Sequence, residues 1–330
     1  MSDPPPFQLA VMWGAALLIQ ALGEAHGQPY PARPIRWIVP SSPGGGTDIT
    51  ARFIAPKLSE YLGQQVVVEN RAGANTMIGT QFVARSIADG YTLLLVATGP
   101  FITNPAIYNK VPYDPMRDFA PVTLAVSLPN ILVVHPSLPV RTVKELISLG
   151  KSRPGQLSYA SAGTGSAPHL SMELFLTMTG LKIIHVPYKG AGPGVLDVLA
   201  GHIVVMMPSI VSSLAFVRDG RLRGLAVTSA KRASAAPDIP TIAETALALA
   251  GYDATVTYGV AVPAGTAREI IMTLYSQIAR VLQQPEIKAR FLADGAETVA
   301  SSPDEYSSYM AGELTKWTKV INTVGIKVEQ

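Results

Sequence analysis

The chain has 330 residues, no cysteine, a formal net charge of +3 and 15% charged residues against 48% hydrophobic ones. The length allows about two domains, and the lack of cysteine excludes disulfide scaffolds, thiol catalysis, thiolate zinc sites and iron–sulfur clusters. Because Lys and Arg never form a run of five and aromatic residues make up only 7%, the composition also excludes a basic stripe for nucleic acid.

The first predicted element is a targeting segment. Residues 7–22 form an apolar run of 16 residues, which is shorter than the roughly 20 that a spanning helix needs. Small residues follow, so the pattern predicts a signal peptide over residues 1–27, cleaved near Ala25 or Gly27. An uncleaved hydrophobic N-terminus is the alternative, because residues 1–6 lack the usual Lys or Arg. Removal of Asp3 and Glu24 with this segment raises the net charge to +5 and leaves about 303 residues.

Short apolar runs then alternate with helical patterns, which predicts an α/β protein with parallel, doubly wound sheets. Strands are expected at residues 35–39, 65–69, 92–97, 130–134, 157–160, 183–186, 203–207 and 222–227. Helices are expected between them at residues 48–61, 77–88, 143–152, 169–179, 194–200 and 212–219. After Pro240 we expect one long extended crossing at 252–262 and three helices at 267–282, 285–294 and 303–324.

The first candidate site is the glycine-rich turn PSSPGGGTD at residues 40–48, between a predicted strand and a predicted helix. It matches neither a P-loop nor a dinucleotide fingerprint, and Thr47 or Asp48 is the expected helix cap. Backbone N–H groups at a helix start favour an anion such as a carboxylate or a phosphate. A tight turn with a capped helix is the alternative.

A second junction, ASAGTGSAPHL at residues 160–170, offers similar chemistry with hydroxyls at Ser161, Thr164 and Ser166. Its serine pattern is not that of a nucleophile elbow. His169 is either a ligand group or a helix-start residue with a local hydrogen bond. The two turns lie in different candidate domains, so we expect them to face each other across a cleft.

Two further segments follow predicted strands. In residues 186–194, Tyr188 and Lys189 are able to donate to an anion, although a solvated Lys189 beside a turn is the alternative. Residues 98–105, which start at Thr98, are expected at the base of the cleft. The five histidines are scattered and no glycine-rich turn holds paired carboxylates. The sequence therefore predicts a binding protein, with no catalytic residue, no metal site and no cofactor.

From about Tyr30 to Val328 the chain resembles the periplasmic solute-binding receptors of tripartite tricarboxylate transporters, called Bug receptors. The resemblance rests on motifs in this order: YPARPIRWIVPSSPGGGTD, VVVENRAGA, DGYTLLL, YDPMRDFAPV, LSYASAGTGSAPHL, HVPYKG, LRGLAVTSAKR, PDIPTIAE and PAGT. It implies a type II periplasmic binding protein, with two doubly wound α/β domains, a ligand cleft, and a hinge near residues 98–130 and 252–260. Domain 1 would combine residues 28–128 with 253–330, and domain 2 would span 129–252.

The resemblance also implies the function. A monomeric receptor in the periplasm would capture a small carboxylate by hinge closure and deliver it to membrane transporter subunits. The ligand would be a di- or tricarboxylate, an acidic amino acid or an aromatic acid. The runner-up is a ligand-sensing receptor for a histidine kinase, and a periplasmic hydrolase or lyase is the third hypothesis.

The family's binding turns match three sets of residues in this sequence. These are Ser42, Pro43, Gly44, Gly45 and Asp48; Ser161, Ala162, Gly163, Thr164, Ser166 and His169; and Tyr188, Lys189 and Gly190. The chain departs from the family at Pro208 and Ser209, where an Asp, often followed by Asn, is usual, and at Val204, where another Asp is usual. Loss of these acids predicts that the site does not bind an α-amino acid tightly and prefers a plain or aromatic carboxylate.

Overall fold

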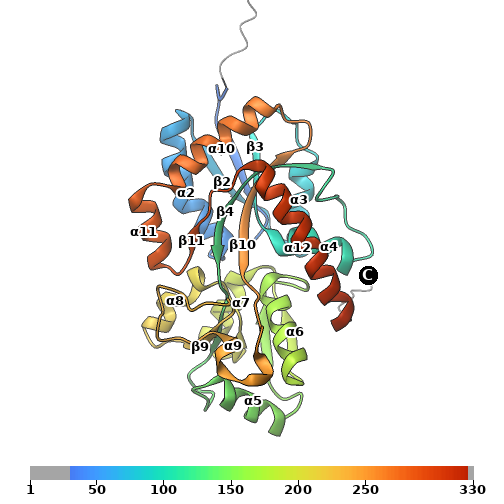
Figure 1. Ribbon diagram of the computed structural model, residues 1–330, viewed down its shortest axis with the longest axis vertical. Helices are drawn as coiled ribbons and strands as arrows, with labels where there is room; N and C mark the ends of the chain where they lie inside the picture. Colours follow the sequence, from blue (N-terminus) through green and yellow to red (C-terminus); the bar gives the residue numbers. More distant parts are fainter. Residues whose placement is uncertain (1–29, 326–330) are drawn as a thin grey trace, which may run out of the picture. The chain divides into compact units, whose positions relative to one another are not determined.

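The computed structural model describes residues 30–325, so the predicted signal peptide at 1–27 lies outside the described residues. From Arg33 onward the chain forms one compact unit. It contains a six-stranded sheet in the order β11-β4-β10-β3-β1-β2 and a five-stranded sheet in the order β7-β6-β8-β5-β9. We call the six-stranded sheet with its helices the first lobe and the five-stranded sheet with its helices the second lobe (Figure 1).

The first lobe is built from both ends of the described chain. Its strands are β1 (Ile35–Val39), β2 (Val66–Asn70), β3 (Thr92–Ala97), β4 (Phe119–Leu128), β10 (Val256–Pro263) and β11 (Glu297–Thr298). Its helices are α2 (Gly46–Leu62), α3 (Met77–Ala84), α4 (Thr98–Ile107), α10 (Arg268–Leu282), α11 (Pro285–Ala293) and α12 (Pro303–Val324).

The second lobe comes from the middle of the chain. Its strands are β5 (Ile131–Val134), β6 (Ser158–Ser161), β7 (Ile184–Pro187), β8 (Val205–Met206) and β9 (Arg223–Val227). Its helices are α5 (Val143–Ser152), α6 (Ala167–Thr179), α7 (Ala191–Leu199), α8 (Ile210–Arg218) and α9 (Ile242–Thr245), and a 3₁₀ turn spans Leu247–Leu249.

The strand directions confirm the predicted α/β class but correct the expectation of wholly parallel sheets. Strand β1 pairs in parallel with β2 and β3, and β6 pairs in parallel with β7 and β8. Strand β10 is antiparallel to both β3 and β4, and β5 is antiparallel to β8 and β9. The antiparallel strands β5 and β10 are those that follow a crossing of the chain from one lobe to the other. A strand that arrives from the other lobe enters its sheet from the opposite end.

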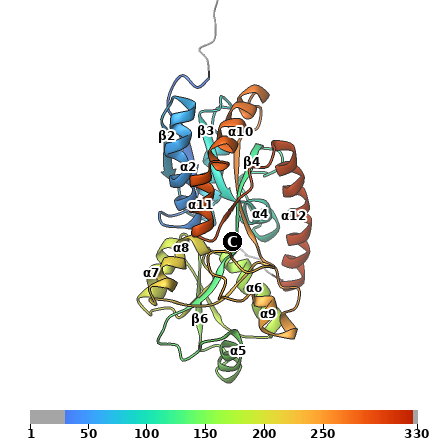
Figure 2. The ribbon, with the colours of Figure 1, turned by 60° about the vertical axis from the view of Figure 1, so that its left-hand side comes forward.

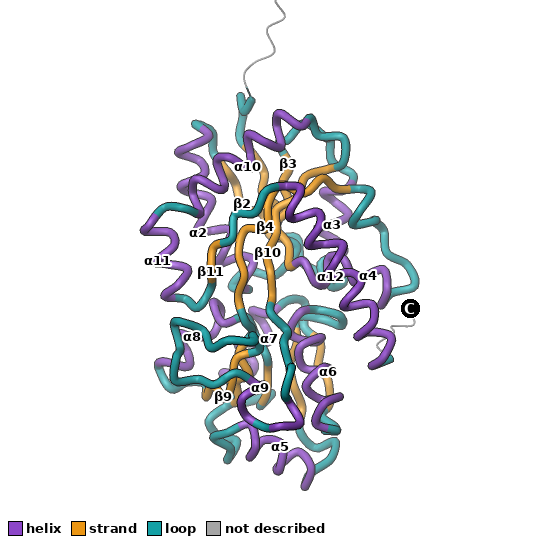
Figure 3. The backbone as a smooth tube through the Cα atoms, viewed as in Figure 1, coloured by secondary structure: helices purple, strands orange, loops and turns teal. Residues whose placement is uncertain are grey.

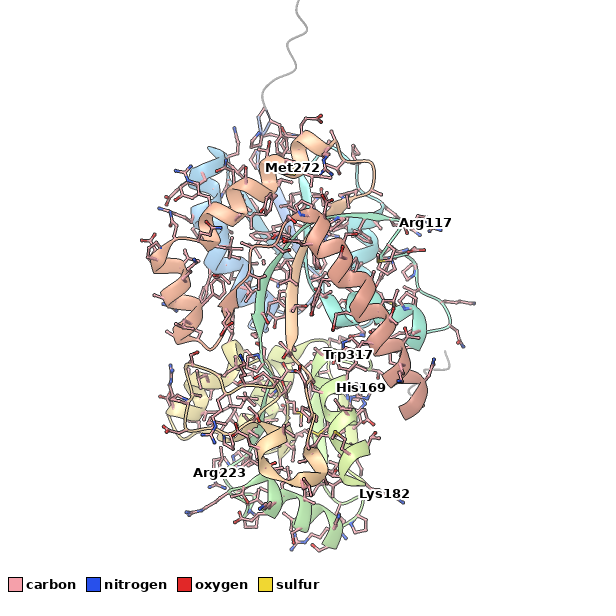
Figure 4. The ribbon with its side chains drawn as sticks, in the orientation of Figure 1. Arg117, His169, Lys182, Arg223, Met272 and Trp317 are labelled. Carbon is pink, nitrogen blue, oxygen red and sulfur yellow. The ribbon has the colours of Figure 1, made fainter. Side chains whose placement is uncertain are left out.

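Two segments cross between the lobes. Strand β4 leads directly into β5, and β10 receives the chain from the second lobe (Figure 3). The predicted crossing at 252–262 is present as β10, whereas β4 and α4 were not among the predicted elements. The long helix α12 adds a further link, because it packs on α4 and β4 and also touches α6 (Figure 2). Trp317 lies at the end of α12 that faces α6 (Figure 4).

The central strands of both sheets are fully buried. Residues 93–96 of β3 and 131–134 of β5 have no exposed surface, as expected for strands covered by helices on both faces. This burial holds the ends of the strands in fixed positions. Six strands lead into helices at their carboxyl ends: β1, β2, β3, β6, β7 and β8. In the described part of the chain, no helix is long and apolar enough to cross a membrane.

Candidate ligand-binding site

A cavity of about 310 Å³ lies between the two lobes. Its walls come from the junctions where parallel strands of each sheet lead into helices, which is where α/β proteins bind ligands. From the first lobe the cavity is lined by residues of the turns before α2, α3 and α4, and from the second lobe by residues of the turns before α6, α7 and α8. Val256 and Tyr258 of β10 complete the lining.

Six helices begin at this cavity. The residue that precedes the first turn of each, its N-cap, lines the cavity in every case: Gly45 (α2), Thr76 (α3), Ala97 (α4), Ser166 (α6), Gly190 (α7) and Ser209 (α8). Only Ser166 caps its helix with a side-chain hydrogen bond. The first N–H groups of a helix lack intrahelical partners and carry the positive end of its dipole. The cavity is therefore surrounded by donors that favour an anion.

The charges of the lining agree with this preference. Among the described residues that line the cavity there is no Asp, Glu, Arg or His, and Lys189 supplies the single charged side chain. The remaining side chains are hydroxyls, the amides of Asn75 and Asn130, and small or apolar groups such as Pro100 and Val256. Elsewhere in residues 30–325, no three His, Asp or Glu side chains gather in a way that could hold a metal ion. The chemistry of this lining suits an anion with an apolar body.

The first turn is held by Asp48 rather than capped by it. Oδ2 of Asp48 accepts from the Gly44 N–H at 2.9 Å, and Oδ1 accepts from Arg52 Nε and Asn70 Nδ2, both at 2.9 Å. Asp48 is 3% exposed and does not line the cavity. The expected cap at Thr47 or Asp48 is therefore wrong: the N-cap is Gly45. This leaves the Gly46 and Thr47 amides without a side-chain cap at the cavity wall.

The second turn rests on a stack of aromatic rings. The rings of His169 and His185 are 4.1 Å apart, and Tyr159 lies 4.9 Å from His185. Ser161 Oγ is 2.6 Å from His185 Nε2 and accepts from the Gly163 N–H at 3.1 Å. His169 Nδ1 accepts from the Gly165 N–H at 3.0 Å. The two histidines and Ser161 therefore shape the turn from behind, and the local hydrogen bond is the role that the geometry gives His169.

Both histidines are held neutral. Burial lowers the pKa of His169 to about 3, with a further contribution from His185, and burial lowers the pKa of His185 to about 4. A neutral ring is able to accept a hydrogen bond on one nitrogen, which is what the Gly165 amide requires of His169. Protonation would place two positive rings face to face, so the stack depends on the neutral form.

The third turn makes the tightest contact between the lobes. Gly190 has φ +119°, and a Cβ at this position would lie 2.2 Å from Ser42 Oγ. Only glycine fits both the backbone conformation and this approach. Tyr188 lines the cavity and donates from its hydroxyl to Asp197 Oδ2 at 2.5 Å, and burial raises its pKa to about 12. Lys189 is exposed at the cavity edge.

Other contacts show that the lobes are closed around the cavity. The Tyr108 hydroxyl, at the end of α4, donates to the backbone oxygen of Thr164 in the second lobe. At Gly46 of α2, a Cβ would lie 2.2 Å from the Tyr258 hydroxyl and 2.5 Å from Ser209 Oγ of the second lobe. These contacts join the turns before α6 and α8 to the first lobe.

A loop before α3 also lines the cavity, and the sequence analysis did not single it out. Ala74, Asn75 and Thr76 have φ of +43°, +45° and +72°, a conformation that residues with a side chain rarely adopt. The Asn75 Nδ2 group donates to Asn104 Oδ1 at 2.7 Å, and the Asn104 Nδ2 group donates back to the Asn75 backbone oxygen at 2.9 Å. Asn75 lines the cavity, and its Oδ1 is a buried acceptor without a hydrogen-bond partner among the described residues.

The structure divides the predicted site residues into two groups. Nine line the cavity: Gly45, Ala162, Gly163, Thr164, Ser166, Tyr188, Lys189, Gly190 and Ser209. Eight do not: Ser42, Pro43, Gly44, Asp48, Thr98, Ser161, His169 and Pro208. Most of these eight residues support the turns that line the cavity. Thr98 is the clearest departure, because its buried hydroxyl is 3.1 Å from the Tyr306 hydroxyl and faces α12.

Several lining residues carried no signal in the sequence. Tyr258 and Val256 belong to a buried strand, and Tyr108 directly follows α4, beyond the segment 98–105 that was expected at the base of the cleft; of that segment, Pro100 does line the cavity. The loop at Ala74–Thr76 has a partial signal, since it begins at the last residue of the motif VVVENRAGA, but that motif holds no glycine-rich run before a helix.

Comparison with known proteins places these features in a family. The model of the tripartite tricarboxylate transporter family receptor matches residues 50–326. Protein BugT of Bordetella pertussis is 40% identical over 301 residues, which cover 91% of this chain and 92% of BugT. A protein of R. palustris solved with adipate is 38% identical, with a TM-score of 0.88 over 90% of this chain and 99% of that one. The periplasmic binding protein BugD is 31% identical, with a TM-score of 0.87 over 91% and 100%. The structural matches confirm the predicted type II periplasmic binding-protein fold.

Proposed function

This chain belongs to the tripartite tricarboxylate transporter receptor family, whose members are solute-binding proteins, and on that premise we propose that it captures a small carboxylate in the cavity between its lobes. One observation carries the proposal: six helices begin at a cavity that no acidic side chain of the described residues lines. A carboxylate gains from each uncapped N–H group and from each helix dipole, with about 0.3–1 kcal/mol per helix end.

The shape and polarity of the cavity favour a plain or aromatic carboxylate. The apolar wall formed by Pro100, Ala167 and Val256 suits a hydrocarbon body. The related R. palustris protein was solved with adipate, a dicarboxylate with such a body. Lys189 at the cavity edge supplies a charge for a second carboxylate. In this proposal Gly45, the 162–166 turn and Gly190 hold the first carboxylate through their backbone.

An α-amino group would lack a strong acceptor in this cavity. The two Asp residues that the family resemblance leads us to expect are absent here, at Pro208 and Val204, and Pro208 is buried with its backbone oxygen accepting from the Ile131 N–H at 2.9 Å. The Asn75 Oδ1 acceptor is neutral and suits a hydroxyl or a water molecule better than an ammonium group. We therefore propose that the site discriminates against acidic amino acids.

Binding of the carboxylate would be coupled to its delivery to a transporter. We propose that residues 28–128 with 253–330 and residues 129–252 act as two domains that open and close at the β4 and β10 crossings. The closed form, with Tyr108 on Thr164 and Ser42 on Gly190, would present the loaded receptor in the periplasm to membrane subunits of a tripartite tricarboxylate transporter. The receptor would work as a monomer, because its site is complete within one chain.

Mass spectrometry of small molecules released from the denatured, purified protein tests this proposal. The proposal expects a released organic acid with one to three carboxyl groups and no amino group. Protein refolded after removal of its contents should take up that acid again. Release of an amino acid, a sugar or a cationic compound, and its specific uptake by the refolded protein, would replace the proposal.

A further inference from the structure

A second concave surface lies on the outer side of α3, away from the ligand cavity. This groove has a volume of about 640 Å³. Four arginines line it, Arg33, Arg36, Arg71 and Arg85, together with the rings of Phe82 and Tyr91. We call this surface the arginine groove. The ligand-binding function does not use any of these side chains.

The guanidinium groups are arranged around two carboxylates and two rings. Arg36 binds Glu69 with two hydrogen bonds of 2.7 and 2.8 Å, and Arg71 lies within 3.5 Å of the same carboxylate. Arg33 pairs with Asp89 at 2.8 Å. Four positive charges therefore face two negative ones, which leaves the groove with an excess of positive charge. The Arg36 guanidinium holds the pKa of Glu69 below its usual range, so this carboxylate stays charged.

The arginine side chains are partly fixed by the aromatic rings. The Arg71 guanidinium lies 3.8 Å from the centre of the Phe82 ring, and that of Arg36 lies 4.9 Å from it. Arg33 lies 4.2 Å above Tyr91. Cation–π contacts of this kind hold the guanidinium planes in place, and a guanidinium has five N–H donors, of which Glu69 and Asp89 take up only a part. A fixed guanidinium loses less side-chain entropy when it binds a carboxylate.

Arg85 is the charge without an acidic partner. It is exposed at the end of α3, and its Nη2 lies 2.7 Å from the side-chain amide of Gln81, whose oxygen accepts from it in the amide orientation that satisfies both groups. No carboxylate of the described residues lies within ion-pair distance of it. Beside it, Ile78 and Ile87 expose 53% and 78% of their surface. The groove thus combines unpaired positive charge with two apolar side chains at its rim.

We propose that the arginine groove is a docking surface for an acidic segment of a partner protein, one that carries apolar side chains between its carboxylates. Charge complementarity selects carboxylates, and Ile78 and Ile87 select the apolar side chains. The concave form and the side chains folded onto Phe82 favour a peptide segment over a planar lipid surface, which would meet protruding cations instead. This inference goes beyond carboxylate capture, and it does not depend on which carboxylate the cavity holds.

The groove shares a loop with the ligand cavity. Arg71 begins the loop, Ala74, Asn75 and Thr76 line the cavity, and Ile78 stands at the groove. The backbone oxygen of Arg71 lies 2.7 Å from where a Cβ of Gly79 would stand, so α3 is packed directly on this loop. A partner bound to the groove would therefore contact the same loop that touches the ligand.

The test uses the whole protein and a fluorescein-labelled peptide that alternates pairs of glutamates with single leucines. Fluorescence anisotropy compares the protein with the variants Arg85→Glu and Ile87→Ser. Arg280→Glu is the matched control, since Arg280 also stands exposed in the last turn of a helix, α10. We expect the wild-type protein to bind the peptide saturably. Arg85→Glu should weaken the peptide affinity about tenfold, and Ile87→Ser should also weaken it. Arg280→Glu should leave it unchanged.

Two parallel measurements separate the outcomes. Titration with the carboxylate released from the protein checks that each variant still folds and binds, so that loss of docking is distinguished from loss of ligand capture. Flotation with phosphatidylglycerol vesicles provides the lipid arm. Binding to vesicles but not to the peptide, with loss on Arg85→Glu, would overturn the proposal in favour of a lipid surface. Equal peptide binding by Arg85→Glu and Arg280→Glu, or no peptide binding at all, would also overturn it.

Discussion

The Tyr108 hydroxyl donates to the backbone oxygen of Thr164 across the cleft, so that a side chain of the first lobe holds the second binding turn in place. Burial raises the pKa of Tyr108 to about 12, which keeps the hydroxyl protonated as a donor at all ordinary pH values. If the lobes open and close as proposed, this bond forms only in the closed form, and we expect it to contribute to the affinity for the ligand rather than to the fold of either lobe.

Tyr108→Phe should weaken carboxylate binding by about fivefold, because a hydrogen bond of this kind contributes about 0.5–1.5 kcal/mol. The loss should fall mainly on the dissociation rate, measured by stopped-flow fluorescence. Tyr275→Phe, on α10, is the control and should leave both affinity and rate unchanged. An unchanged dissociation rate in Tyr108→Phe would show that this contact does not hold the closed form.

Gly190→Ala should block closure. Its Cβ would lie 2.2 Å from Ser42 Oγ in the opposite lobe, and φ is +119°. We expect the carboxylate affinity, measured by calorimetry, to fall by at least about tenfold. Gly180→Ala is the matched control, because Gly180 also has a positive φ of +68° but has open space around its Cβ position. It should lower the free energy of unfolding by about 1 kcal/mol and leave the affinity intact. Equal affinities in the two variants would contradict the tight lobe contact.

Asp48→Asn should loosen the first turn without touching the ligand. The substitution removes an acceptor for the Gly44 N–H and the ion pair with Arg52. We expect a loss of about 1–3 kcal/mol in the free energy of unfolding and a weaker carboxylate affinity, measured by denaturation and calorimetry. Glu60→Gln on the same helix breaks only the exposed pair with Lys57 and should change neither quantity. If Asp48→Asn binds as the wild type does, Asp48 does not position the turn.

The stacked histidines predict how stability depends on pH. A histidine in the unfolded chain titrates near pH 6.5, whereas His169 and His185 have pKa values of about 3 and 4 in the fold. The unfolded chain therefore binds more protons below pH 6.5, and the stability falls as the pH falls from about 6.5 toward 4. The slope is up to about 1.4 kcal/mol per pH unit for each histidine.

Chemical denaturation at several pH values measures this slope. The double variant His169→Asn, His185→Asn should show a flatter pH dependence than the wild type between pH 6.5 and 4. His202→Asn is the control, because the His202 side chain is 73% exposed. The same slope in the wild type and in the double variant would mean that the two rings do not titrate as their burial implies.

The strand and helix pattern could be predicted from the sequence because buried strands and amphipathic helices leave periodic signals. Strand β3 and helices α5 and α12 have the predicted bounds. The antiparallel direction of β10 could not be predicted, because an extended apolar run looks the same in either direction. Strand β4 is interrupted by Pro121 and lies within the predicted hinge segment, where no separate strand was expected.

Within the site, the sequence pattern at strand–helix junctions led to nine residues that line the cavity, out of 17 predicted site residues. The residues that were missed lack that pattern: Tyr258 is a strand residue, and Ala74–Thr76 lie at the junction between β2 and α3 but adopt positive φ without a glycine run. Conversely, Thr98 and Asp48 stand where ligand groups are expected, but other side chains take up their polar atoms: Tyr306 for Thr98, and Arg52 and Asn70 for Asp48. The direction of the Thr98 side chain depends on a tertiary partner, which the local sequence does not encode.

Matched titration calorimetry tests the central claim most directly, namely that helix N-termini without an acidic side chain select a carboxylate that lacks an amino group. The purified protein is titrated with succinate and aspartate, with glutarate and glutamate, and with adipate and 2-aminoadipate. We predict that at least one dicarboxylate binds and that each dicarboxylate binds at least about tenfold more tightly than its amino counterpart. Tighter binding of the amino acid in these pairs would contradict the account.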